Sequence, residues 1–172
     1  MDKKPILASL AVAGLLAALA AAAIGLALAA PAGAMPPAAL KLEESVTFGD
    51  GHTPPVGVFT AVGGLPGCSS GTFGDRLNNF NFGGHTLVID RTYSCANGTD
   101  TFTARIVLHI EPPNDAGIAT SNGNWTIQDG TGALTALHGE GDANSTAFGC
   151  APIGELFFSC VSGVDEVTAV TH

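Results

Sequence analysis

Basic residues are scarce in this sequence: six Lys and Arg stand against fifteen Asp and Glu, which gives a net charge of −9 at pH 7. Only four of the six lie beyond residue 34, and these are Lys41, Arg76, Arg91 and Arg105. Proteins that bind nucleic acids need basic side chains to neutralise phosphates. The composition therefore disfavours a nucleic-acid partner. It indicates a protein whose negative charge keeps it soluble outside the cell.

Motifs of nucleophilic and nucleotide chemistry are also absent. The sequence has no G-x-S-x-G elbow, no P-loop and no dinucleotide fingerprint. Its five His residues show no metal-ligand spacing, and no C-x-x-C pair is present. No cofactor and no metal ion are therefore expected, the catalytic residues are unknown, and whether the protein is an enzyme stays open.

A single long apolar run occupies the N-terminus. Two lysines precede an uncharged, Ala-rich stretch, and an Ala-Gly-Ala cleavage motif ends at Ala34. We therefore predict three segments: a signal peptide at 1–34, a linker at 35–44 and a secreted domain at 45–172. The apolar run is longer than that of a typical signal, and about 20 residues can span a bilayer. An uncleaved membrane anchor, with the domain facing outward, is the alternative.

The four cysteines all lie in the exported part of the chain. An even number of cysteines in an oxidising compartment indicates disulfide bonds. Of the three possible connectivities, we favour Cys68–Cys95 with Cys150–Cys160, because it closes the shorter loops. Zinc binding by these cysteines is the alternative, which the spacing disfavours.

Beyond residue 44 the pattern is one of short strands separated by Gly, Asn, Asp and Pro. The candidate strands are Ser45–Phe48, Val56–Val62, Asn79–Phe82, Thr86–Cys95, Thr99–Glu111, Gly117–Thr120, Asn124–Gln128, Glu140–Phe148, Glu155–Cys160 and Glu166–Val170. Many short strands without helices predict an all-β sandwich or barrel.

One hairpin can be set in register from the sequence. Asn97-Gly98 is the preferred pair for a two-residue type I′ turn, so residues whose numbers sum to 195 should face each other. The predicted pairs are Leu87–Leu108, Ile89–Ile106, Arg91–Ala104 and Tyr93–Phe102 on one face, with Val88–Val107, Asp90–Arg105 and Thr92–Thr103 on the other. Apolar residues meet apolar residues and opposite charges meet. A second Asn-Gly pair, at 122–123, predicts a further hairpin with Ile118 opposite Ile127.

The segment GNWTIQDGTGALTALHGEG, from Gly123 to Gly141, resembles small actinobacterial proteins related to the allene oxide cyclase barrel. Those proteins are similar to dirigent proteins and other calycin-type barrels. The run from Tyr93 to Arg105 resembles the secreted, cysteine-bearing members. The resemblance covers about Cys68 to Cys150. It implies a single antiparallel up-and-down β-barrel of about eight strands after an N-terminal apolar signal helix. It implies no activity, because the cyclase catalytic residues do not match residue by residue.

Arg91 is the most unusual residue, because it shares the apolar face of the predicted hairpin. A buried arginine needs a partner. In a structural interpretation it pairs with an inward carboxylate such as Glu140 or reaches solvent at a barrel end. In a functional one it holds an anionic group in the barrel mouth. The candidate ligand-binding residues are Arg91, Tyr93, Trp125 and Glu140, although Trp125 is also a natural core residue.

The sequence therefore leads to three functional hypotheses. The leading hypothesis is a secreted, disulfide-stabilised barrel that binds a small apolar or amphiphilic molecule, or acts as an extracellular accessory protein. The second is an isomerase or cyclase in which Arg91 orients an anionic substrate and Glu140 or Tyr93 moves a proton. The third is a structural module of the cell envelope with a filled barrel. The expected partner is a small apolar or anionic ligand; oligomers are possible, and membrane contact is expected only through an uncleaved N-terminal segment.

Overall fold

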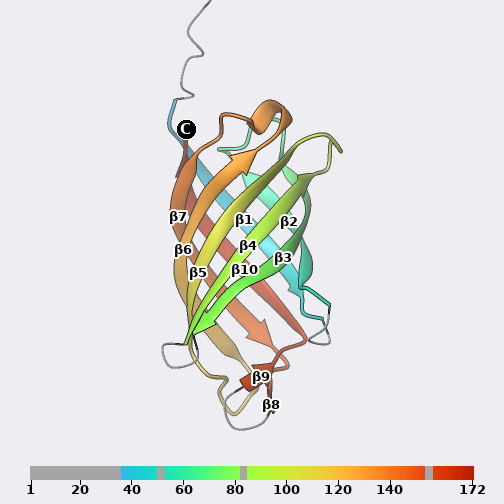
Figure 1. The fold of residues 1–172 in the computed structure, drawn as a ribbon, viewed down its shortest axis with the longest axis vertical. Coiled ribbons are helices and arrows are strands. Elements are labelled where there is room, and N and C mark those ends of the chain that lie inside the picture. Colours follow the sequence, from blue (N-terminus) through green and yellow to red (C-terminus); the bar gives the residue numbers. More distant parts are fainter. Residues whose placement is uncertain (1–35, 50–52, 82–84, 154–156) are drawn as a thin grey trace, which may run out of the picture. The chain divides into compact units, whose positions relative to one another are not determined.

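The computed structural model describes residues 36–49, 53–81, 85–153 and 157–172. Eight strands form one closed antiparallel barrel in the order β1-β10-β7-β6-β5-β4-β3-β2 (Figure 1). The barrel strands are β1 (Ala38–Thr47), β2 (Val56–Val62), β3 (Ser70–Asn81), β4 (Thr86–Cys95), β5 (Thr101–Ile110), β6 (Ala119–Gly130), β7 (Gly139–Phe148) and β10 (Ser162–Thr171). The predicted all-β up-and-down barrel is confirmed. The predicted signal peptide at 1–34 lies outside the described residues.

Two short elements accompany the barrel. A 3₁₀ turn, η2 (Gly132–Leu134), connects β6 to β7, and a small hairpin of β8 (Ala151–Ile153) and β9 (Phe157–Ser159) lies at the lower end in Figure 1. The chain ends at the opposite, upper end, where the backbones of His138 and His172 bond to each other. No helix among the described residues has the length and apolar character needed to cross a membrane.

The hairpin of β4 and β5 has the register that the sequence predicts. The structure pairs Leu87 with Leu108, Ile89 with Ile106, Arg91 with Ala104 and Tyr93 with Phe102, and on the outer face Val88 with Val107, Asp90 with Arg105 and Thr92 with Thr103. The outer ion pair forms with 3.1 Å between Arg105 Nε and Asp90 Oδ1. Arg91 therefore points into the barrel.

The loop of that hairpin differs from the prediction. The Cys95 N–H bonds to the Asp100 carbonyl, so the loop comprises residues 96–99 instead of a two-residue type I′ turn. Gly98 alone takes a positive φ, of 76°. Asn97 instead uses its side-chain oxygen to accept bonds from the N–H groups of Thr99 and Asp100, an Asx-type turn. Because loops of two and four residues give the same pairing sum, the register survives.

The start of the barrel also differs from the prediction. β1 begins at Ala38 and not at Ser45, so most of the predicted 35–44 linker is strand. Leu40 and Leu42 are fully buried and alternate with partly or fully exposed residues, which is the pattern of a half-buried strand. Pairing with both β10 and β2 then extends the strand toward its N-terminus.

The hairpin predicted at residues 122–123, with Ile118 opposite Ile127, is wrong, because β6 runs straight through the Asn-Gly pair. Gly123 has no positive φ. A Cβ at this glycine would instead clash with the Val107 carbonyl of the neighbouring strand. The glycine permits a close approach of two backbones, as glycines inside strands often do.

The upper half of the barrel is filled with side chains. Its largest members are fully buried and form one layer of contacting rings, the aromatic layer: Phe59, Tyr93, Phe102 and Trp125. The rings of Tyr93 and Phe102 lie parallel with 4.3 Å between their centroids. Leu134 and Leu137, from the segment between β6 and β7, cover this layer and are buried. Within the described part of the chain, only the lower half of the barrel therefore has room for a ligand in its interior.

Disulfides join Cys68 to Cys95 at the upper end and Cys150 to Cys160 beside the β8–β9 hairpin. The favoured connectivity is confirmed. The second disulfide ties the end of β7 to the segment that leads into β10. Each bridge thus holds a loop region to the rim of the barrel.

Candidate functional site

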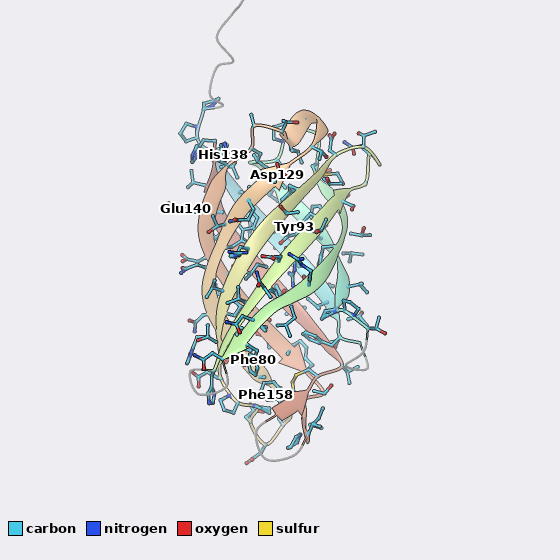
Figure 2. All side chains as sticks on the ribbon, in the orientation of Figure 1. Phe80, Tyr93, Asp129, His138, Glu140 and Phe158 are labelled. Carbon is cyan, nitrogen blue, oxygen red and sulfur yellow. A yellow bond between two sulfur atoms is a disulfide. The ribbon has the colours of Figure 1, made fainter. Side chains whose placement is uncertain are left out.

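A cavity of about 500 Å³ occupies the lower half of the barrel. Leu87, Ile89, Leu108 and Ile110 line one wall, and Phe158 from β9 stands at its outer end. Figure 2 shows Phe158 at the lower end of the barrel and Tyr93 well above it. The cavity therefore runs inward from the β8–β9 hairpin and ends below the aromatic layer.

Small side chains on β6 and β7 create this space. Their inward positions near the cavity carry Ala119, Ser121, Ser145 and Ala147, whereas the same strand β6 presents Trp125 in the filled half. An eight-stranded barrel is just wide enough for its side chains to fill it or to leave room for one small ligand. Here the large Trp125 fills the upper half of the barrel, whereas the small Ala119 and Ser121 on the same strand leave room for a ligand in the lower half.

The inner end of the cavity is formed by a buried cluster around Arg91. Its Nε and Nη2 donate to the two oxygens of Asp75 at 2.6 and 2.8 Å, in the bidentate geometry that favours Arg–carboxylate pairs. Its Nη1 donates to Asp165 Oδ2 at 2.8 Å and also to Glu44 Oε2. The guanidinium carbon lies 4.0 Å from the ring centroid of Phe73. Arg91 itself is only 3% exposed.

Strand register explains why these charges meet. Asp75 is the direct cross-strand neighbour of Arg91, and Glu44 is that of Asp165. The two pairs lie on different parts of the closed sheet, with β2 between them on one side and β7, β6 and β5 on the other. Arg91 therefore reaches across the interior and bridges two neighbouring carboxylates that would otherwise repel each other.

A chain of hydrogen bonds links the cluster to the aromatic layer. The Tyr93 hydroxyl donates to Glu44 Oε1 at 2.7 Å, and Trp125 Nε1 donates to the Tyr93 oxygen at 3.1 Å. Both rings are fully buried. Every polar atom in this chain thus has a partner, as buried groups require.

The cluster contains more negative than positive charge. Three carboxylates surround one guanidinium, so with all four groups ionised the net charge is −2. Burial, opposed by Arg91 and reinforced by Asp165 and Asp75, raises the pKa of Glu44 from 4.5 to about 7. Burial and the neighbouring Glu44 raise the pKa of Tyr93 well above its ordinary value. Near neutral pH, the Glu44 carboxyl is therefore poised between its two protonation states.

Three of the four candidate ligand-binding residues are brought together, since Arg91, Tyr93 and Trp125 belong to one connected network. Glu140 is not part of it. It is exposed on the outside of β7, where Figure 2 shows it at the edge of the barrel, and its inward neighbour is Gly139. The pairing of Arg91 with an inward carboxylate is therefore observed, but with different partners. The proton-transfer role considered for Glu140 has no support from its position.

The three carboxylates that hold Arg91 are not among the site residues predicted from the sequence. Glu44 falls in alternation with Leu42 and Val46, which already marks it as inward-facing. Asp75 and Asp165 occupy equivalent inward positions on their strands. The predicted strand begins at Ser45 and leaves Glu44 out, whereas β1 begins at Ala38 and includes this alternation.

A scan against protein-family models, a search of curated proteins and a search of solved structures each returned no match. The resemblance to the allene oxide cyclase barrel group therefore rests on the sequence motif and remains a prediction. The barrel and its charged cavity floor rest on the structure alone.

Proposed function

We propose that this protein is exported and that its barrel binds one small, mainly apolar molecule in the lower cavity. The cavity itself is the observation that carries the proposal. Its volume of about 500 Å³ lies within the roughly 300–1,000 Å³ typical of small-molecule sites. Apolar walls that end in a few polar groups are the usual composition of such sites.

Most of the cavity wall belongs to paired strands of the barrel, and the rest includes residues between β1 and β2, such as Pro54 and Pro55. The aromatic layer above is packed, and the lower disulfide, Cys150–Cys160, holds the segment that carries Phe158. A preformed cavity of this kind requires little ordering when a ligand enters, which favours binding. These features favour a binding protein over a structural module with a filled barrel.

Export is supported by the two disulfides, which persist in oxidising compartments and are rare in the cytosol. The acidic composition and the apolar N-terminal run point the same way. Mass spectrometry of the protein collected from culture medium tests this part, since cleavage after Ala34 predicts a defined loss of mass. Retention of the full chain in the membrane fraction would contradict cleavage and favour the uncleaved anchor, and retention in the cytosol would contradict export.

Fluorescence titration with the neutral apolar probe N-phenyl-1-naphthylamine tests the binding site. Leu108→Trp is designed to fill the cavity, because this side chain lines it, and Val107→Trp is the matched control on the outer face of the same strand. We expect the wild type and V107W to bind one probe per chain and L108W to bind at least about tenfold more weakly, a difference of about 1.4 kcal/mol. Equal binding by L108W and V107W, or no binding by the wild type, would overturn the proposal.

A further inference from the structure

We propose that the molecule bound in the lower cavity carries a cationic group, such as a protonated primary amine, which Asp165 and Asp75 receive at the inner end. The inference rests on the proposed binding function and names the chemical class of its ligand. It differs from the anionic ligand that an inward arginine predicts when the sequence is considered alone.

Arg91 has little capacity left to hold an anion. Four of its hydrogen bonds already go to the surrounding carboxylates: two to Asp75, one to Asp165 and one to Glu44. A guanidinium has five N–H donors in all. An incoming carboxylate would have to displace Asp75 or approach a cluster that is already negative. Both events cost electrostatic free energy in a poorly solvated site.

Among the three carboxylates at the inner end of the cavity, which forms its floor, Asp165 is the most accessible hydrogen-bond acceptor. Its side chain is 11% exposed, against 4% for Asp75 and 0% for Glu44. Its Oδ2 accepts from Arg91, whereas its Oδ1 accepts no hydrogen bond from the residues that the structure describes. An ammonium group has three donors and no acceptor. It can therefore bond to the open oxygen of Asp165 without breaking the bond to Arg91.

The geometry favours an organic cation over a metal ion. The three carboxylates surround the guanidinium, and within the described part of the chain no set of three acidic or His side chains converges on a common metal position. Away from this end the lining is mostly apolar, with Leu87, Ile89 and Leu108 on one wall and the small polar residues Ser121 and Ser145 on another. The side chain of Arg76, which also lines the cavity, is 80% exposed and bonds to Asp90. An amine attached to an apolar body matches both the floor and the walls.

Binding of a cation should be coupled to release of a proton. The charged and titratable groups that face Glu44 are Asp75 on β3, Arg91 and Tyr93 on β4 and Asp165 on β10. Burial and the two aspartates hold the pKa of Glu44 at about 7. A positive charge on the ligand offsets those aspartates and lowers this pKa. Amine affinity should therefore rise as the pH increases through 7.

Three ligands with one apolar body test the charge preference: octylamine, octanol and octanoate, each used to displace N-phenyl-1-naphthylamine at pH 8. We expect octylamine to bind about tenfold more tightly than octanol, a difference of about 1.4 kcal/mol, and octanoate to bind most weakly. Equal or tighter binding of octanol or octanoate would overturn the inference and leave the binding function standing. Failure of all three ligands and of the probe would overturn both.

Asp165→Asn tests the receiving group, with Glu166→Gln as the matched control. Asp165 faces the cavity, whereas Glu166 is the next residue on the same strand and faces outward. D165N should lose most of the amine-over-alcohol preference, and E166Q should keep it. Calorimetry in phosphate and in Tris at pH 7 should also show release of protons on octylamine binding to the wild type. An unchanged preference in D165N that retains native Trp125 fluorescence would overturn the inference; if D165N does not fold, Asp75→Asn and the three-ligand comparison decide.

Discussion

Replacing Glu44 with Gln should remove a pH dependence of stability that the wild type shows. The Glu44 carboxyl is fully buried, and its pKa rises from 4.5 to about 7 on folding. Each pKa unit corresponds to about 1.4 kcal/mol, so the whole rise corresponds to about 3 kcal/mol in the free energy of unfolding. Gln resembles the neutral carboxylic acid in size and does not titrate.

The direction of this pH dependence follows from which state, folded or unfolded, keeps the Glu44 proton. Between pH 4.5 and about 7 the folded protein keeps the Glu44 proton, whereas the unfolded chain loses it. The contribution of this group is therefore complete below pH 4.5 and is lost as the pH rises through 7. Urea unfolding at several pH values, followed by the fluorescence of the single Trp, measures it. The wild type minus E44Q difference should fall with increasing pH, with most of the change between pH 5 and pH 8.

The difference between the two proteins is the useful quantity, because the other carboxylates titrate in both of them. Glu43→Gln is the control, since Glu43 is the adjacent residue on β1 but its side chain is 67% exposed. The wild type minus E43Q difference should be nearly independent of pH over the same range. A flat difference for E44Q would refute the reasoning, because it would mean that burial does not disfavour the ionised carboxylate.

Three further changes test the cluster and its supports. Arg91→Leu leaves buried carboxylates without a counter-charge and should cost roughly 3–5 kcal/mol in urea unfolding; a gain in stability would show that they have no need of it. Replacing Cys68 and Cys95 together by Ser removes a cross-link between residues 27 apart and should cost roughly 3–4 kcal/mol, and an unchanged urea midpoint would contradict this. Tyr93→Phe deprives the Trp125 indole N–H of its acceptor and should cost roughly 1–3 kcal/mol with a changed near-ultraviolet circular dichroism spectrum; a spectrum and midpoint like those of the wild type would count against the hydrogen-bond chain.

The register of the β4–β5 hairpin could be predicted because every pair carries its own information. Apolar residues match across the strands, and Asp90 matches Arg105, so a slip by one residue would break all of these contacts at once. The second Asn-Gly pair, at 122–123, has no such matching run on both sides. There the turn preference of two residues is overridden by the pairing of β6 with β5 over Ser121–Gly130 and with β7 over Ala119–Thr126.

The partners of Arg91 could not be predicted, because they depend on the closure of the barrel. Glu44 and Asp165 are 121 residues apart in the numbering, yet they are cross-strand neighbours, since β1 and β10 close the sheet. Strand alternation identifies an inward carboxylate on one strand but does not say what lies across the interior. Glu140 was predicted as a possible inward partner of Arg91 because it lies between two glycines, but its position on β7 faces outward.

The ligand binding proposed above would explain the composition of the cluster better than a contribution to stability does. Buried ion clusters are often no more stable than well-packed apolar residues of similar size. The raised pKa of Glu44 shows that its surroundings disfavour its charge in spite of Arg91. An apolar residue at this position would extend the row of Leu40 and Leu42 and avoid that cost. The charges are concentrated where the cavity ends, and Asp165 lines the cavity with an Oδ1 atom that accepts no hydrogen bond from the described residues, so a cationic ligand would gain from them there.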